Sequence, residues 1–358
     1  MKRLLCFELR KILARRTALF SLAVLLLLSL ALSLSTLQSM YAFDGQGREG
    51  SGLEAVKIDR ELASRYGGVL TDESVSRMLE NFRPQYDLHG MNAKYLYQNA
   101  VQSSVFARFA DLDGNWNGLS VRDVFGAEEI KAGYVNGLLN TGSNLAKLFL
   151  ALAFVLMFLL APVFAGEYGG VDGIILSSRY GRTKCAAAKV LAALITALLV
   201  WLLLSGLNLI FAFAVYGTEG LDCSILFAPV EFTEGFIPYN MRCGTLLGWQ
   251  LLLGLSGALC AAGMALLFSS LCRSSLAAFA ISAALYIMPV LLPVSEQSPL
   301  YRLLLLLPVY EAQYISLLSA PALNGGLPYA LCAVSVSLPL ALLLAYFAHR
   351  IFSARQVS

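Results

Sequence analysis

Residues 190–216 read VLAALITALLVWLLLSGLNLIFAFAVY, a run that contains no Asp, Glu, Lys or Arg. A helix of about 20 consecutive apolar residues is long enough to cross the hydrocarbon core of a bilayer. Because lipid offers no hydrogen-bond partners, the backbone N–H and C=O groups of a membrane span must bond to one another. An uninterrupted apolar run of this length does so as a helix rather than as a barrel strand. The stretch therefore predicts a membrane-spanning α-helix.

Five more apolar runs lie along the chain, so we expect six spans. The other five are residues 17–40, 145–165, 244–268, 276–294 and 327–348. Composition supports this interpretation, because the 358 residues are 58% hydrophobic and 14% charged, whereas a soluble domain has about 25% charged residues. We predict an all-α polytopic membrane protein.

Basic residues gather on one side of the predicted spans. They are frequent in residues 1–16, 166–189, 269–275 and 349–358, whereas residues 41–144 and 217–243 hold more acids than bases. Because Lys and Arg are retained in cytoplasmic segments, this bias places both termini in the cytoplasm of a multi-pass plasma-membrane protein. The bases form no single soluble patch, so we expect no nucleic-acid partner.

The first sixteen residues have the pattern of an amphipathic helix. Leu5, Leu9, Ile12 and Leu13 share one face, and basic residues surround it. Such a helix lies in the headgroup plane and contacts membrane lipids; the alternative is a simple basic flank. The apolar run that follows is longer than the core of a secretory signal, so we expect an uncleaved first span.

The segment 41–144 is too long for a plain connection. Its apolar positions favour helices near residues 51–66, 72–82 and 94–109, separated by Gly and Pro. We predict a small, mostly helical extracytoplasmic domain between the first two spans. Likewise, residues 295–326 predict an apolar re-entrant or interfacial hairpin, because a seventh span would place Glu311 at mid-membrane at high cost.

One motif in the outer segment resembles half of a calcium loop. Oxygen-bearing side chains stand at its first, third and fifth positions, namely Asp113, Asn115 and Asn117. The twelfth position is Val124, where a calcium loop needs a bidentate acid. The alternative is a polar turn before a helix capped by Ser120, with Asp123 completing a capping box.

Cysteine spacing points to no metal site, because none of the seven cysteines forms a C-x-x-C pair. Cys223 and Cys243 are the two cysteines that we place on the extracytoplasmic side. A disulfide between them would contribute about 3 kcal/mol. The alternative is that both are unpaired, since connectivity cannot be deduced from sequence.

Signatures of catalysis are absent from the sequence. His89 and His349 are expected in different compartments, and there is no H-E-x-x-H, G-x-S-x-G or P-loop motif. We therefore expect no enzyme activity, no metal and no cofactor in this chain. Counted from Leu148 in the second run, the six apolar cores also lack Asp, Glu, Lys and Arg, which disfavours an ion-coupled carrier.

The loop 166–189, GEYGGVDGIILSSRYGRTKCAAAK, has a composition that a plain connection would not need. It carries four basic residues together with a small apolar patch: Arg179, Arg182, Lys184 and Lys189, then Val171, Ile174, Ile175 and Leu176. A chain without an internal ion relay must take its energy from elsewhere. We therefore expect this cytoplasmic loop to be the docking point of a partner.

The pattern resembles the membrane subunit, or permease, of type-2 ATP-binding-cassette (ABC) exporters, over nearly the full chain. The sharpest likeness is in the loop after the second span, at Phe164, Glu167, Gly173, Ile174, Ile175, Leu176, Arg182 and Lys189. The chain departs from the family at Ser178-Arg179-Tyr180-Gly181, where relatives often have Pro before the Arg.

The resemblance implies a coupling helix that sits in a groove of a separate ATPase subunit, which binds the ATP and magnesium. Ile174, Ile175 and Leu176 would fill the groove. Arg179, Arg182 and Lys184 would contact the partner or lipid headgroups, Glu167 and Gly173 would shape the entry, and Lys189 would close the segment. Six spans make half of a translocation unit, so a homodimer or a heterodimer with a sister permease is implied.

The resemblance also implies efflux, and the apolar cores favour a hydrophobic or amphipathic substrate such as a lipid, a drug or an antimicrobial peptide. Two other functions stay open at this point. One is a membrane sensor or scaffold whose outer domain binds a ligand. The other, less favoured, is an ion-coupled secondary transporter.

Overall fold

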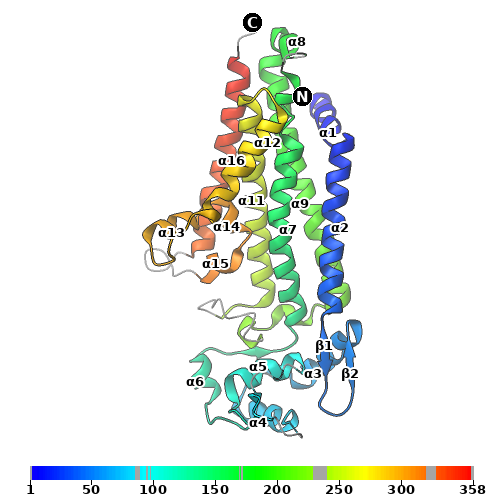
Figure 1. Ribbon diagram of the computed structural model, residues 1–358, viewed down its shortest axis with the longest axis vertical. Helices are drawn as coiled ribbons and strands as arrows, with labels where there is room; N and C mark the ends of the chain where they lie inside the picture. The colour runs from blue at the N-terminus through cyan, green and yellow to red at the C-terminus, as the bar shows by residue number, and fades with distance from the viewer. Residues whose placement is uncertain are drawn as a thin grey trace. The chain divides into compact units, whose positions relative to one another are not determined.

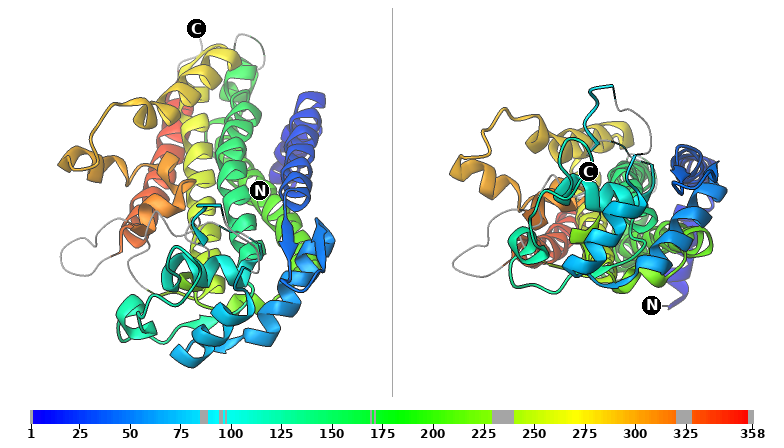
Figure 2. Two further views of the ribbon diagram at one scale, coloured as in Figure 1. Left: turned by 60° about the horizontal axis from the view of Figure 1, so that its bottom comes forward. Right: turned by 90° about the horizontal axis from the view of Figure 1, so that it is seen from below.

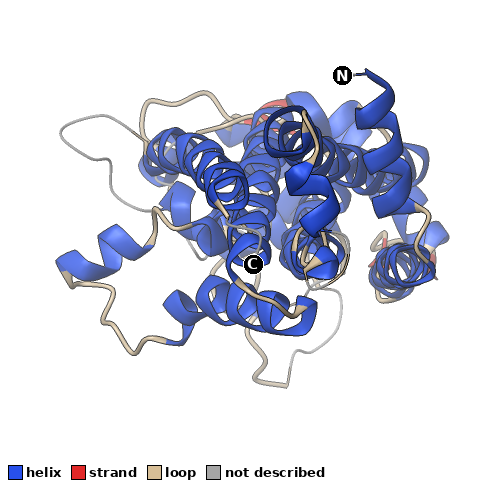
Figure 3. Cartoon of the chain, turned by 90° about the horizontal axis from the view of Figure 1, so that it is seen from above, coloured by secondary structure: helices blue, strands red, loops and turns tan. Residues whose placement is uncertain are grey.

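A computed structural model of the chain describes residues 2–84, 89–93, 96, 98–168, 170, 172–228, 240–319 and 328–355. Helix predominates among these residues (Figure 3). Five helices are long and apolar enough to cross a membrane: α2 (Arg16–Gln38), α7 (Asn136–Leu160), α9 (Ala186–Tyr216), α11 (Cys243–Leu271) and α16 (Tyr329–Ala354). The chain is therefore a mostly helical, polytopic membrane protein.

The expected sixth span is shorter than predicted. Helix α12 (Ser275–Leu291) has 17 residues and contains Pro289. At about 1.5 Å per residue it extends roughly 26 Å, less than the hydrocarbon core of about 30 Å. The described chain thus has five full-length candidates and one shorter apolar helix where six equal spans were expected.

The long helices also extend beyond the apolar runs from which they were predicted. Helix α7 begins at Asn136, inside the segment expected to be outer domain, and includes Lys147. Helix α9 includes Lys189, which is fully buried. The apolar cores from Leu148 and from Val190 still lack charged residues, but each helix extends past its core to include a lysine, because helix propensity continues past the point where hydropathy falls.

Contacts divide the chain into two compact units. The first comprises Met1–Ser29, Leu145–Gly206 and Trp249–Ser358, and the second comprises Leu30–Asn144 and Leu207–Gly248. The boundary falls within α2, α7, α9 and α11, so each of these helices contributes residues to both units.

In the first unit α11 lies between α7 and α16 (Figures 1 and 2). Small residues allow this close approach. A Cβ at Gly254 would overlap the ring of Phe149 on α7, and one at Gly263 would lie 2.9 Å from the carbonyl oxygen of Ala341 on α16. These glycines explain how a mostly apolar helix packs closely on two neighbours.

Three short helices follow α12 in the first unit: α13 (Pro299–Leu304), α14 (Pro308–Glu311) and α15 (Tyr314–Ser319). Proline opens α13 and α14, where its missing N–H costs nothing. The three helices occupy the segment 295–326 that was predicted to be a re-entrant or interfacial hairpin, and its placement in a membrane stays a prediction; residues 320–327 lie outside the described part. Helix α14 contacts α12 and α16.

The N-terminal helix α1 (Lys2–Leu13) also belongs to the first unit. It ends before Arg16, where α2 begins, in agreement with the predicted amphipathic segment. Its most buried residues are Glu8 and Ile12. Its position in a headgroup plane stays a prediction.

The second unit is built on α3 (Leu53–Tyr66), α4 (Asp72–Asn81), α5 (Ala100–Phe109) and α6 (Val121–Phe125). Apolar side chains of α3, α4 and α5, among them Ile58, Met78 and Phe106, form its core. The helices predicted near residues 51–66 and 72–82 are present, and the third begins at Ala100, whereas residues 94, 95 and 97 lie outside the description.

Two short antiparallel ribbons in this unit were not expected. They pair β1 (Tyr41–Phe43) with β2 (Glu49–Ser51), and β3 (Gly68–Val69) with β4 (Lys131–Ala132). Strands of two or three residues are too short to show an alternating pattern. The side of the membrane on which this unit lies stays a prediction.

The motif at Asp113, Asn115 and Asn117 forms a polar turn. The carboxylate of Asp111 accepts the N–H groups of Asp113 and Asn115, and the amide of Asn117 donates to the carbonyl of Arg108 at 3.0 Å. Ser120 and Asp123 then form a capping box at the start of α6. The capping box at Ser120 and Asp123 is as predicted, whereas calcium binding at Asp113, Asn115 and Asn117 stays an untested alternative.

Cys223 and Cys243 are both buried free thiols. Their backbones are adjacent, because the N–H of Cys243 donates to the carbonyl of Cys223 at 2.9 Å. The Cys223 thiol is directed to the carbonyl of Ala132, 3.7 Å away. Burial raises the pKa of the Cys223 thiol, which disfavours the thiolate that disulfide formation requires.

Candidate functional site

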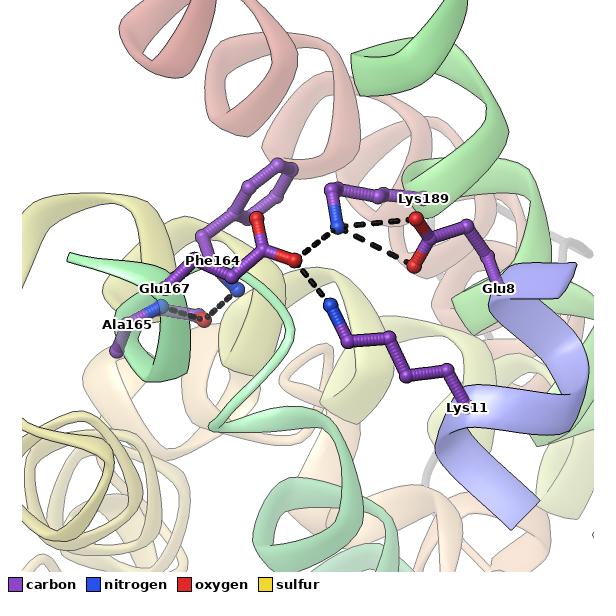
Figure 4. Close-up of polar contacts among 7 residues, drawn as sticks. Glu8, Lys11, Phe164, Ala165, Glu167 and Lys189 are labelled. Atoms are coloured by element: carbon purple, nitrogen blue, oxygen red, sulfur yellow. Dashed lines mark hydrogen bonds and ion pairs between the residues drawn. The ribbon is translucent and has the colours of Figure 1, made fainter. Parts of the chain in front are cut away.

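Four charged side chains meet at the base of the loop 166–189 (Figure 4). Glu8 and Lys11 come from α1, Glu167 ends the short 3-10 helix η2 (Ala165–Glu167), and Lys189 lies in the first turn of α9. The Nζ of Lys189 donates to Glu167 Oε1 at 2.6 Å and to both oxygens of Glu8 at 3.1 and 3.2 Å. Lys11 donates to the same oxygen of Glu167.

The charges of this cluster balance, and three of them are withdrawn from solvent. Lys189 is 0% exposed, Glu8 4% and Glu167 5%, whereas the Lys11 side chain keeps a third of its surface. Removing such charges from water costs several kcal/mol per ion, which only close pairing offsets. The loss of one partner would leave the others buried without a counter-charge. The cluster therefore fixes α1, η2 and α9 to one another.

Ser269 of α11 holds the chain where α7 ends and η2 begins. Its hydroxyl accepts the N–H groups of Phe164 and Ala165 at 2.9 and 3.1 Å, and donates to the carbonyl of Ala161 at 2.6 Å. Helix α7 ends before Pro162, which has no N–H to continue the ladder. This turn directs Glu167 toward the two lysines.

The last turn of α16 packs on the same region. The ring of Phe352 lies 4.7 Å from that of Phe164 and 6.3 Å from that of Tyr168. The guanidinium of Arg355 stands 3.5 Å above the Tyr168 ring, a cation–π contact. The C-terminal end of α16 is thereby anchored to the start of the loop.

Arg182 connects the other end of the loop to α16. Its side chain donates to the carbonyl of Leu176 at 3.1 Å and to that of Ser353 at 3.2 Å. The hydroxyl of Ser353 donates back to the carbonyl of Arg182 at 2.5 Å. Arg182 is thus committed to holding the loop together, and the expectation that it contacts a partner or lipid is not supported.

Helix α8 (Asp172–Ser177) forms the tip of the loop. Ile174 is 72% exposed, Ile175 is half-buried and Leu176 is 3% exposed. The expectation that all three fill a partner's groove is corrected for Leu176, because one turn of helix cannot present three consecutive side chains to one side. Gly173 is half-buried, and Val171 lies outside the described residues.

A single π turn, η3 (Gly181–Cys185), leads from the tip into α9. A Cβ at Gly181 would overlap the carbonyl oxygen of Ile175. Only glycine allows η3 to pass this close to α8. The departure from the family pattern at Ser178-Arg179-Tyr180-Gly181 therefore includes the residue that the loop's geometry requires.

The remaining bases of the loop face outward. Arg179 and Lys184 are exposed and flank the ring of Tyr180, with charged atoms 5.3 and 4.2 Å from its centroid. Tyr180 is itself 46% exposed. The four bases thus divide into two internal residues, Arg182 and Lys189, and two surface residues beside an aromatic ring.

Sequence reasoning missed Glu8 as a site residue and counted it only as a charge. The signal was present, since Glu8 lies three residues after Leu5 and four before Ile12, on the apolar face. An acid on that face needs a buried cation. Ser269 and Phe352 carried no comparable signal, because their roles depend on helices distant in sequence.

Among the described residues, no three His, Cys, Asp or Glu side chains come close enough together to hold a metal. Comparison with protein-family models, with curated proteins and with solved structures finds no match to this chain. The likeness to exporter permeases therefore rests on the residues of the chain itself.

Proposed function

We propose that this chain is the membrane-spanning permease subunit of an ATP-driven exporter, energised by a separate ATPase subunit that docks on the loop 166–189. The observation that carries the proposal is the exposed Ile174 on a loop whose base is fixed by Glu8, Glu167 and Lys189. A single exposed isoleucine is ordinary. An isoleucine on a loop that a buried ion-pair cluster holds in place is suited to a partner's apolar groove.

The bonds at the base of the loop support this function because they connect helix α8 to several helices of the first unit. A displacement of α8 would reach α16 through Arg182 and Ser353. It would reach α1, α7 and α9 through the ion-pair cluster at Glu167. Packed interiors shift between discrete arrangements rather than deform continuously, so movement at the tip would be delivered to the membrane helices.

The rest of the proposal follows from the resemblance. The ATPase supplies the ATP and magnesium sites, and a second permease, identical or a sister chain, completes the pathway. The substrate is hydrophobic or amphipathic and leaves the cytoplasm or the membrane. Both termini are then cytoplasmic in the plasma membrane, as the distribution of Lys and Arg indicates.

The test is co-purification of the tagged chain with an ABC ATPase subunit from the cells in which the chain is naturally made. We expect Ile174→Asp to reduce the recovered ATPase at least about tenfold, because a buried unpaired carboxylate costs well over the 1.4 kcal/mol that a tenfold change requires. Its melting temperature should not change, since Ile174 is exposed in the isolated chain.

Thr183→Asp is the matched control, because it adds the same charge at an exposed position of the same loop. It should retain the ATPase. Full retention by Ile174→Asp would refute docking at α8, and equal loss in both variants would show a general charge effect instead of a groove contact.

One observation favours the alternative function of a sensor. The second unit has a cavity of about 490 Å³, lined by Lys57, Arg60, Glu61, Ala63, Ser64, Gly67, Ala132, Gly133, Tyr134, Glu219 and Cys223. The buried hydroxyl of Tyr134 has no hydrogen-bond partner among the described residues. Transport by reconstituted vesicles distinguishes the two functions: a permease exports only while ATP is hydrolysed, whereas a sensor exports nothing.

A further inference from the structure

Glu311, the last residue of α14, is an acid without a partner inside the first unit. It is 0% exposed, and neither carboxyl oxygen forms a hydrogen bond with any described residue. Few native buried polar groups are left in this condition. The residue belongs neither to the loop nor to the ion-pair cluster of the proposed function.

The surroundings of Glu311 are small and nearly apolar. A Cβ at Gly257 of α11 would lie 3.1 Å from Glu311 Oε2, so the carboxyl occupies the space that a side chain there would fill. The hydroxyls of Ser256 on α11 and Ser337 on α16 lie near it without closing a hydrogen bond. Gly257 therefore admits a carboxyl that nothing in the described chain neutralises.

No basic side chain acts on this carboxyl among the described residues. The titratable groups facing it are Cys260 on α11 and Tyr286 on α12, whose hydroxyl donates to the carbonyl of Pro308 at 3.3 Å. Tyr310 on its own helix donates to the carbonyl of Pro289. These three groups are neutral at pH 7.

An ionised carboxylate in such a place costs several kcal/mol, and a buried acid without a cation takes up a proton instead. We propose that Glu311 is a proton-binding site between α11, α14 and α16. It holds its proton at neutral pH and releases it to water only when α14 separates from Gly257. The proton then governs whether this short helix stays packed, independently of ATPase docking.

The first test uses carbodiimides on the full-length protein in lipid nanodiscs. Dicyclohexylcarbodiimide is apolar and adds to protonated carboxyls, so peptide mass spectrometry should find its adduct on Glu311, with a yield that falls as pH rises. Glu296 is the matched control, because it is exposed in the same segment. A water-soluble carbodiimide with glycine ethyl ester should label Glu296 and spare Glu311.

Two results would overturn the proposal: labelling of Glu311 by the water-soluble reagent to the same extent as Glu296, or no adduct with the apolar reagent at any pH. Both are read on the wild-type protein, so neither depends on a variant that folds.

The second test is amide hydrogen exchange of α14 and α15 in the wild type and in Glu311→Gln. The amide keeps the shape of the protonated acid but cannot ionise. At pH 4, where the carboxyl keeps its proton in both the packed and the separated state, the two proteins should exchange equally. From pH 5 to pH 7 the exchange of the wild type should rise about tenfold per pH unit relative to the variant, because separation then releases the proton. An equal ratio throughout this range would show that no proton controls the packing of α14.

Discussion

Lys189 is the residue on which the base of the loop depends most, since it contacts two buried carboxylates at once. Its loss would leave Glu8 buried without a counter-charge, because the hydrogen-bond partner of the Glu8 carboxylate among the described residues is this ammonium. Lys11 cannot replace it, because Lys11 is partly solvated and already donates to Glu167. Residues of the cluster therefore differ in importance according to burial.

We expect Lys189→Met to destabilise the protein by about 3–5 kcal/mol, the usual result of breaking a buried pair. Lys147→Met is the matched control, because Lys147 is exposed on α7, and it should change stability by about 0.5 kcal/mol or less. Chemical unfolding in detergent measures both variants.

The double variant Lys189→Met/Glu8→Gln sharpens the test. It removes the charge that the single variant strands, so its loss of stability should be smaller than the sum of the two single losses. Strictly additive losses would contradict a shared ion-pair cluster.

At the scale of the element, α8 and the π turn η3 form one structure, because η3 passes directly against α8. Gly181 permits η3 to pass against the carbonyl of Ile175. The hydrophobic tip, the π turn and the Arg182 bonds to α16 would therefore be lost together. This explains how a loop with few buried residues can hold Ile174 outward.

Gly181→Ala should consequently open this element, because the added methyl has no space and the obstacle is backbone rather than a flexible side chain. We expect faster trypsin cleavage after Arg179 and Arg182 and a lower melting temperature. Gly206→Ala on α9 is the matched control, since nothing lies within 4 Å of its Cβ position. It should stabilise the helix by about 0.5–1 kcal/mol; equal proteolysis of both variants would contradict the steric argument.

At the scale of the whole molecule, stability should depend on pH through Asp59 of α3. Asp59 is 4% exposed and accepts the N–H of Ala100 at 2.8 Å. Burial raises its pKa to about 7, whereas in the unfolded chain the value is about 3.9. The folded protein therefore keeps a proton that the unfolded chain releases between these two values.

Because the folded state binds the extra proton, its stability falls as pH rises from 4 to 7 and is level above 7. A shift of about three units corresponds to at most ~4 kcal/mol. Melting of the full-length protein at pH 5 and pH 8 measures the effect, and Asp59→Asn should reduce the difference. Parallel changes in wild type and variant would show that Asp59 is not responsible.

Much of the fold was predictable because its signals are local. Apolar runs such as residues 190–216 and the capping box at Ser120 and Asp123 depend only on near neighbours in sequence. The short helix at residues 172–177 was expected from the resemblance to exporter permeases. The ends of helices were less predictable, and Lys147 and Lys189 fell inside helices because helix propensity continues past the point where hydropathy falls.

In the candidate site, too, some features follow from the local sequence and others from contacts between distant residues. Sequence by itself determined a helical membrane protein with a basic, partly apolar loop between two long helices, because hydropathy and charge are properties of single residues. Only the tertiary structure decided that Glu8 pairs with Lys189, that Leu176 turns inward while Ile174 stays exposed, and that Glu311 has no partner. These outcomes depend on contacts between residues far apart in the chain, such as the 181 positions that separate Glu8 from Lys189, and no local pattern records which distant surfaces will meet.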